Sequence, residues 1–149
     1  MASMDLERIK QTLQEFVDRK NGIQGFALVG KGGVLITKPP IGNWNQNTVG
    51  LIAGIMAQLT THIGERLKWD SAQDIYVESK DGYIMRVACS SHMFLLVKAS
   101  NMTNQGLLEV AIAPIVEEIQ AEINARSSIN KEARNNNGGN DSQQPQGRY

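Results

Sequence analysis

Residues 23–37, IQGFALVGKGGVLIT, decide the fold of this chain. Two short apolar runs flank a Gly-rich turn, which predicts a β-hairpin with strands at residues 25–31 and 34–38. Pro39 and Pro40 follow, and we expect them to end the second strand because proline has no backbone hydrogen to donate to a sheet. A helical pattern precedes the hairpin and another follows it. This order of helix, hairpin and helix is compatible with few folds.

The remaining apolar residues recur with helical or strand spacing. Helices are expected at residues 6–17, 47–67 and 104–125. Further strands are expected at residues 75–79, 83–89 and 92–99. Pro114 lies inside the last predicted helix. Because proline removes a helix hydrogen bond, we expect a kink or a break there.

The last two predicted strands are apolar on both faces. One face of the first of them carries Tyr83, Met85, Val87 and Cys89, and the other face carries Ile84 and Ala88. Antiparallel strands of this kind need a cover on each side. We therefore predict an α/β (α+β) sandwich with a five-stranded antiparallel sheet. The long middle helix would cover one face, and the N- and C-terminal helices would cover the other.

The middle helix has two contrasting sides on a helical wheel. One side is a broad apolar arc that suits the sheet: Ile52, Ile55, Met56, Leu59, Ile63 and Leu67. The other is a file of small residues: Gly50, Gly54, Ala57, Thr61 and Gly64. Glycine inside a helix costs about 0.5–1 kcal/mol relative to alanine, so the file indicates a gain from close backbone approach. We predict that a second copy of this helix packs there in a homodimer. The alternative is a weak helix lying under a loop.

Length and composition exclude several classes of protein. The 149 residues suit one domain with a genuine core. Fifteen basic residues balance fifteen acidic ones, so no broad charge favours nucleic acid or anionic lipid. The single cysteine, Cys89, fits a reducing compartment. The charged N-terminus resembles no signal peptide, and no apolar run is long enough to cross a membrane. We expect a cytoplasmic protein without membrane insertion.

The C-terminal segment differs from the rest of the chain. From about residue 128 it contains almost no apolar residues. Such a segment cannot bury enough surface to offset its ordering entropy. We therefore expect a domain at residues 1–127 and a disordered polar tail at residues 128–149. A solubilising role and a short docking motif are the two alternatives for the tail.

No catalytic motif is visible, and we expect no enzyme, cofactor or metal site. Residues 30–33 read GKGG, but a phosphate loop needs a longer spacing and a following helix. Cys89 and His92 offer two metal ligands without a second pair to complete a tetrahedral site, and they should flank a hairpin. Asp74 and Asp81 lie beside turns, where carboxylates usually bond to the backbone.

The connector after the hairpin contains two apolar residues in polar surroundings, Ile41 and Trp44. If they are exposed, they form a possible partner surface, because tryptophan is a common anchor at interfaces. The alternative, which we favour, is that Trp44 caps the end of the core. Trp69, just beyond the long helix, has the same two interpretations.

The order helix, hairpin, long helix, three strands, helix, with GFALVGKGGVLIT after the first helix, resembles the Roadblock family. That family includes dynein light chains and bacterial and archaeal partners of small Ras-like GTPases. The resemblance covers residues 6–125 and implies a profilin-like sandwich and a homodimer joined by paired middle helices. It also implies that the strands at Ile75–Ser79 meet at the dimer axis, which adds Ile75 and Val77 to the predicted interface. Pro114 and the polar tail depart from the family pattern.

The resemblance implies a non-catalytic regulator or scaffold that docks a small Ras-like GTPase. Such a dimer would modulate GTP hydrolysis by reshaping the GTPase's own site. Two alternatives stay open from the sequence. One is a light-chain-like structural adaptor that acts independently of nucleotide. The other is a small-molecule sensor, although apolar residues on both faces of the sheet count against a preformed cavity.

Overall fold

The computed structural model describes residues 5–19, 22–70 and 74–143, with side chains as far as residue 125. The elements in chain order are α1 (Leu6–Asp18), β1 (Ile23–Gly30), the 3-10 turn η1 (Lys31–Gly33), β2 (Ile41–Gly42), α2 (Gln46–Leu67), β3 (Ile75–Ser79), β4 (Gly82–Ser90), β5 (Met93–Ser100) and α3 (Gln105–Gln143). The five strands form one antiparallel sheet in the order β2-β1-β5-β4-β3. This confirms the predicted α+β class.

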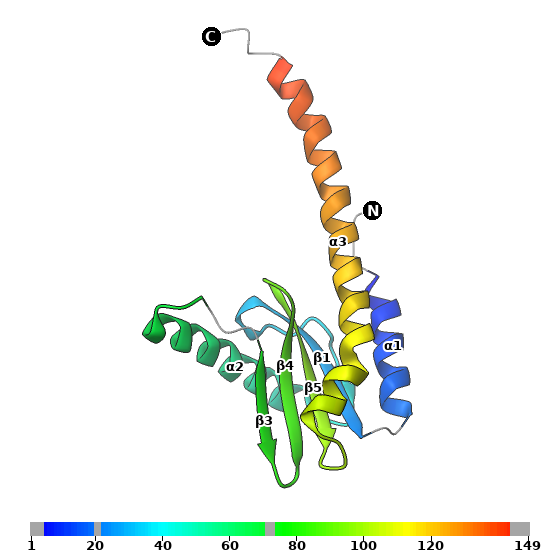
Figure 1. The fold of residues 1–149 in the computed structure, drawn as a ribbon. Coiled ribbons are helices and arrows are strands. Elements are labelled where there is room, and N and C mark those ends of the chain that lie inside the picture. The colour runs from blue at the N-terminus through cyan, green and yellow to red at the C-terminus, as the bar shows by residue number, and fades with distance from the viewer. Residues whose placement is uncertain (1–4, 20–21, 71–73, 144–149) are drawn as a thin grey trace.

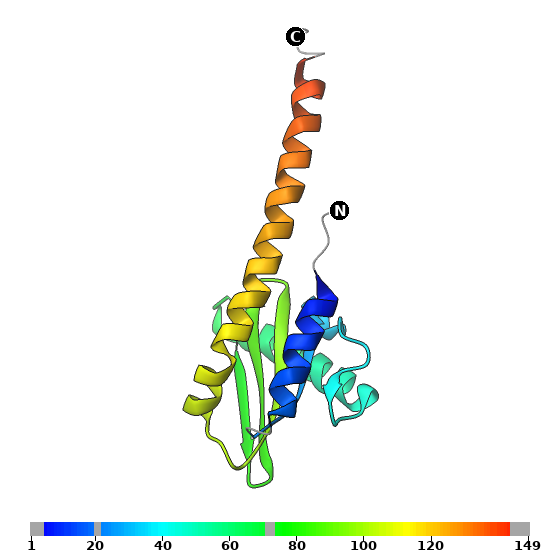
Figure 2. The same cartoon turned by 90° about the vertical axis from the view of Figure 1, so that its right-hand side faces the viewer.

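The sheet has an apolar core on each face. α2 covers one face, and α1 with the first half of α3 covers the other (Figure 1, Figure 2). The alternation predicted for β4 and β5 is confirmed. The side under α1 and α3 includes Met85, Cys89, Leu95 and Val97. The side under α2 includes Ile84, Ala88, Phe94 and Leu96.

Polar side chains fix the starts of all three helices. The oxygens of Asp5, Asn45 and Asn104 accept hydrogen bonds from the first free backbone amides of α1, α2 and α3. Lys68 caps the C-terminal end of α2, and its left-handed φ of 59° lets the Trp69 amide donate to the Gly64 carbonyl at 2.9 Å. Local chemistry therefore sets where α2 begins and ends.

The predicted second hairpin strand at residues 34–38 is wrong. The chain does turn back at η1, and the Ile36 amide donates to the Leu28 carbonyl at 2.7 Å, but only one isolated bridge, Val29–Leu35, forms. The Thr37 hydroxyl instead accepts the Leu28 amide at 3.0 Å. That bond occupies a donor that a regular ladder would use. The strand that pairs beside β1 is β2, after the two prolines.

α3 is longer than the sequence predicts, and the end expected at residue 125 is wrong. The helix passes through Pro114 without a break, although its first turns lie at an angle to the remainder (Figure 2). It then continues to Gln143 and projects away from the sheet (Figure 1), through residues expected to be disordered. After residue 125 no proline occurs before Pro145, and strong helix formers (Arg126, Lys131, Glu132, Ala133 and Arg134) stand among the serines and asparagines. These residues help to extend a helix that has already formed. Residues 144–149 of the predicted tail lie outside the described residues.

Deleting residues 128–149 is expected to change the melting temperature by less than about 2 °C, because almost no apolar residue lies in the deleted segment. Among the side chains that the structure describes, which extend to residue 125, the last buried apolar residue of α3 is Ile119. Thermal unfolding followed by circular dichroism, with the full chain in parallel, measures this. A loss of more than about 5 °C would show that the deleted segment packs on the domain.

Candidate functional site

The two sides of α2 are not arranged as the sequence predicts. The residues buried on the sheet are Val49, Ala53, Met56, Thr60 and Gly64. Most of the arc predicted to face the sheet is exposed: Ile55 is 57%, Leu59 45% and Ile63 38% exposed. Small side chains at Ala53, Thr60 and Gly64 let the helix lie close to the strands, which leaves the larger apolar residues outside. The prediction that the large apolar arc of α2 faces the sheet is therefore wrong.

The turn η1 of the same chain approaches α2 closely at Ala53 and Gly54, although a Cβ atom added at Gly54 would itself meet no atom within 4 Å. A Cβ atom added at Gly33 in η1 would lie 2.7 Å from the carbonyl carbon and oxygen of Ala53 and 2.8 Å from Cα of Gly54. Gly50, Gly54 and Ala57 are half-buried, Thr61 is exposed, and Gly64 is buried under the helix. The file is thus a flank of α2 beside η1, and it does not lie opposite the sheet.

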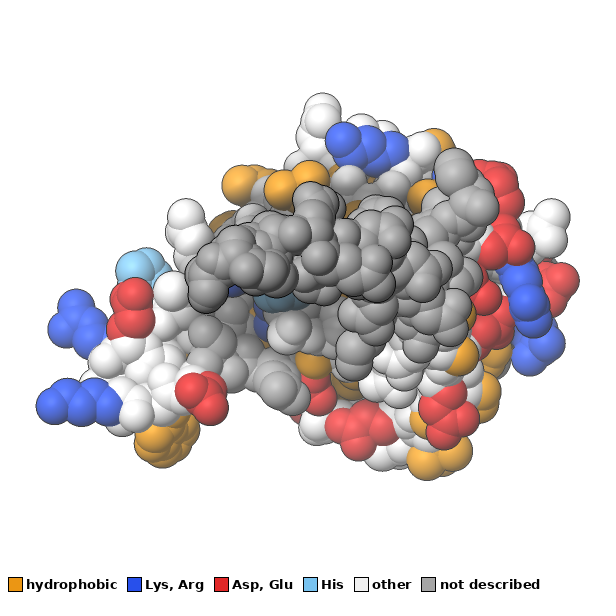
Figure 3. Space-filling view, turned by 90° about the horizontal axis from the view of Figure 1, so that it is seen from above, with side chains coloured by type: hydrophobic (Ala, Val, Ile, Leu, Met, Phe, Trp, Pro, Cys, Tyr) orange, Lys and Arg blue, Asp and Glu red, His pale blue; other side chains and the backbone are white. Residues whose placement is uncertain are grey.

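The exposed apolar residues of α2 form the most distinctive surface of the domain. Together with an exposed apolar residue of β3, they make up what we call the α2–β3 surface: Leu51, Ile55, Leu59, Ile63 and Val77. Among the described strands, β3 pairs only with β4, so β3 is an edge of the sheet. α2 extends beyond this edge (Figure 1). Leu67 and Trp69 are also exposed, and Figure 3 shows hydrophobic side chains beside charged ones at the projecting end of α2. An apolar stripe next to an unpaired strand is typical of an interface.

The possible partner surface at Ile41 and Trp44 lies against the core. Ile41 is buried in β2, and Trp44 is half-buried. The indole Nε1 of Trp44 donates to the Ile41 carbonyl at 3.1 Å, and a Cβ atom at Gly25 would lie only 2.8 Å from Nε1. The indole therefore packs over Gly25, which favours the core-capping interpretation.

The candidate metal ligands and turn carboxylates have ordinary structural roles. Cys89 is buried near the end of β4, and His92 lies in the turn before β5, so the two flank a hairpin as predicted. The Asp74 carboxylate accepts the Ala88 amide at 2.9 Å. His62 is exposed, with Nδ1 3.7 Å from a Glu65 oxygen. Within the described residues, no three potential ligands cluster in a way that could hold a metal ion.

Cys89 is expected to resist alkylation in the native protein. Burial raises the pKa of the Cys89 thiol to about 12, and its side chain is 5% exposed. We expect iodoacetamide at pH 8 to label it at least about a hundredfold more slowly in buffer than in urea. Because the unfolded thiol ionises at lower pH, this group's contribution to stability is lost as pH rises from its ordinary pKa towards 12. Mass spectrometry measures labelling, and comparable rates in both conditions would contradict the burial.

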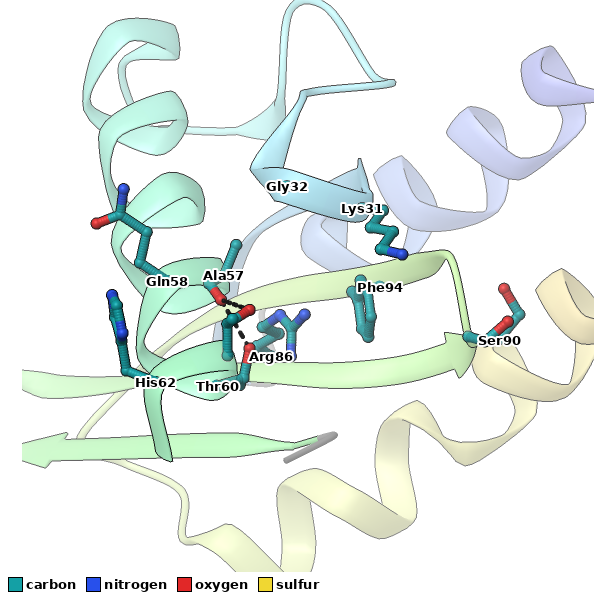
Figure 4. A pocket seen from close by; sticks show the side chains of 11 residues that line it. Lys31, Gly32, Ala57, Gln58, Thr60, His62, Arg86, Ser90 and Phe94 are labelled. Carbon is teal, nitrogen blue, oxygen red and sulfur yellow. Dashed lines mark hydrogen bonds between the residues drawn. The ribbon is translucent and has the colours of Figure 1, made fainter. Parts of the chain in front are cut away.

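The Gly-rich turn lines a pocket that sequence reasoning missed. η1 is followed by the return segment and not by a helix, so no phosphate-loop geometry forms there. Lys31 and Gly32 nevertheless border a cavity of about 530 Å³ between α2 and the ends of β4 and β5 (Figure 4). Arg86 and Phe94 form its inner wall. The available signal was Arg86, a charged residue in the apolar file between Ile84 and Ala88.

Comparisons with known proteins identify the fold. The family model of the Roadblock/LC7 domain matches residues 9–99. The structure of MglB from Myxococcus xanthus superposes with a TM-score of 0.67 at 17% identity, covering 81% of this chain and 98% of that one. A Roadblock/LC7 domain from Streptomyces avermitilis gives a TM-score of 0.63 at 15% identity, covering 76% and 96%. A tetrameric arrangement of MglB gives 0.65 at 13% identity, covering 80% and 90%.

No curated protein matches this sequence. Within the described residues, no helix combines the length and the apolarity needed to span a bilayer. The family match covers more than half of the chain, and the solved structures share its fold. The chain therefore belongs to the Roadblock/LC7 domain family.

Proposed function

We propose that this chain is a cytoplasmic, homodimeric and non-catalytic regulator that docks a small Ras-like GTPase and modulates its GTP hydrolysis. Membership of the Roadblock/LC7 family supports a regulatory role. The observation that carries the proposal is the α2–β3 surface, where large apolar side chains lie beside an unpaired strand edge. The nucleotide and its magnesium ion would belong to the partner.

The proposed dimer joins two copies of the chain through β3 and α2. Pairing of the two β3 edges would extend the sheet and satisfy backbone groups that β4 does not reach. Ile75 and Val77 of β3 stay in the proposed interface, as the resemblance implies. From α2 we now place the apolar stripe there, because it is exposed on the described chain. The file Gly50, Gly54, Ala57 and Thr61 lies on the flank of that interface, and the buried Gly64 leaves it.

The GTPase proposal is tested by affinity isolation from the host's extract with the full chain as bait. One arm contains a non-hydrolysable GTP analogue and the other contains GDP, with mass spectrometry as the readout. We expect a small GTPase that is retained only with the GTP analogue, followed by a change in its hydrolysis rate when the purified proteins are mixed. An identical set of partners in both arms, with no GTPase in it, would contradict the proposal and favour the structural-adaptor alternative.

A further inference from the structure

A groove lies on the face of the sheet opposite α2, between α3 and the strands β3 and β4. α3 packs on β4, and β3 lies to the side of it (Figure 1). The groove has a volume of about 260 Å³, and its floor is formed by Met85, Val87, Ile112 and Val116. The proposed dimer uses the edge of β3 and the outer side of α2. A partner in the groove would therefore leave the proposed dimer interface intact.

The size and the floor of the groove favour an apolar side chain that belongs to a larger partner. Pockets that enclose whole small molecules measure about 300–1,000 Å³, and this groove is smaller. Met85 and Ile112 are buried, while Val87 and Val116 are half-buried and remain open to a further contact. Val110 of α3 is 74% exposed, so apolar surface continues from the groove onto the helix. A side chain seated on this floor would remove apolar surface from water.

The carboxylates of α3 have different surroundings on its two sides. On the side towards α1, a Glu118 oxygen lies 3.5 Å from Nε of Arg8. On the same side, a Glu122 oxygen accepts the backbone amide of Asp5 at 3.1 Å. These two glutamates thus hold α1 and α3 together. The glutamates on the other side of α3 border the groove, and they have no such partners.

Glu109 and Glu117 give the rim of the groove its negative charge. Both are exposed, and within the described part of the chain neither forms an ion pair. Glu109 accepts a hydrogen bond from the neutral side-chain amide of Gln105 at 3.2 Å, which leaves its charge uncompensated. No lysine, arginine or histidine is among the described residues that line the groove. The Asp74 carboxylate at the far rim accepts a backbone amide and lies near Arg86, so we assign it no role in docking.

The negative charge of this face extends from α3 to β3. Tyr76 and Tyr83 stack there with ring centroids 5.4 Å apart, on the same face as the groove. Partial burial raises the pKa of Tyr76, and the stacked Tyr83 adds to this increase. The negative charges of Glu78 and Glu109 raise the pKa of Tyr76 further. Because the whole chain has no net charge, this acidic face is a local property of the surface around the groove.

We propose that this groove docks a basic amphipathic segment of a partner protein, whose apolar side chain fills the groove while its lysine or arginine side chains meet Glu109 and Glu117. These glutamates are two turns apart on α3, which is about 12 Å along the helix axis. An amphipathic helix presents basic residues at this spacing on one side and apolar residues beside them. This inference does not depend on GTPase docking.

The test is a titration of the full-length protein with two synthetic helical peptides, followed by amide chemical shifts in two-dimensional NMR. The first peptide consists of leucine and lysine with its leucines on one side, and the second carries glutamate in place of every lysine. We expect saturable shifts at residues 109–117 and in β4 with the lysine peptide, weaker binding of it at higher salt, and no saturable shift with the glutamate peptide. Shifts confined to α2, no saturation with the lysine peptide, or equal binding of the two peptides overturns the proposal.

Variants of α3 separate the groove from general surface charge. Replacing both Glu109 and Glu117 with glutamine is expected to weaken binding of the lysine peptide about fivefold, since two exposed ion pairs are lost. The matched control replaces both Glu118 and Glu122 with glutamine, which removes the same charge from the side towards α1 and should leave binding unchanged. Ala113→Gln places a longer neutral side chain at an exposed position in the groove and should also weaken binding. Equal weakening by the two double variants, or unchanged binding to Ala113→Gln, overturns the proposal.

Discussion

Replacing Ile55 with arginine is expected to convert a dimer of this chain into a monomer of 16.4 kDa. Ile55 lies at the centre of the apolar stripe of α2 and is 57% exposed, so the single chain has room for the longer side chain. In the proposed dimer the same position would be covered by the second copy. An unpaired charge buried there costs several kcal/mol, which is comparable with the stability of many interfaces. Light scattering coupled to size-exclusion chromatography measures the mass.

Two further variants make this experiment decisive. Val110→Arg places the same charge on an apolar residue of α3 that is 74% exposed, and it should leave the dimer intact. Ala57→Arg tests the small-residue file, which lies on the flank towards η1, and should disturb the mass less than Ile55→Arg does. A wild-type monomer, or an unchanged mass for Ile55→Arg, would contradict the α2–β3 interface. Dissociation by Ala57→Arg alone would return the interface to the small-residue file.

The long helix shows how far sequence reasoning reaches in this fold. Its existence and, to within one residue, both of its ends could be predicted from the apolar repeat and the polar residues after Leu67, which are local signals. Its orientation could not be predicted. On a wheel the large apolar arc suits the sheet better than Ala53, Thr60 and Gly64 do, yet these small residues face it. A helical wheel shows which residues share a side, but it does not show whether the sheet or a second protein covers that side.

The sequence led to a wrong prediction for the hairpin and to no prediction for the pocket, for different reasons. Residues 34–38 have the alternation of a strand, but the Thr37 hydroxyl accepts a hydrogen bond from the Leu28 amide. This contact depends on the folded structure, and the spacing of apolar residues does not reveal it. The pocket depends on Lys31 and Arg86, which are 55 positions apart and are brought together only by the turn of η1 over the sheet. By contrast, the position of Cys89 in a buried strand could be predicted, and Asp74 does bond to the backbone as expected, although its partner is the Ala88 amide in β4 and not an amide of a neighbouring turn.

Substitutions in the Gly-rich turn η1 are expected to have a large effect on the stability of the protein. Gly33→Ala is expected to destabilise the protein by about 3 kcal/mol or more, whereas Gly32→Ala should cost about 1 kcal/mol. Both glycines have positive φ, 82° at Gly32 and 87° at Gly33, so an alanine is strained at either position. A Cβ atom at Gly32 has no atom within 4 Å, while one at Gly33 would lie 2.7 Å from the carbonyl of Ala53. The two variants therefore share the backbone strain and differ only in the contact with α2.

Urea unfolding of the two variants isolates the contribution of that close approach. The difference in unfolding free energy between them measures what α2 gains from a turn with no side chain at Gly33. A large difference would explain why position 33 is a glycine, since the carbonyl of Ala53 leaves no room for a side chain there, whereas a Cβ atom at Gly54 would meet no atom within 4 Å. Equal losses for the two variants would show that η1 can move away from α2 at little cost.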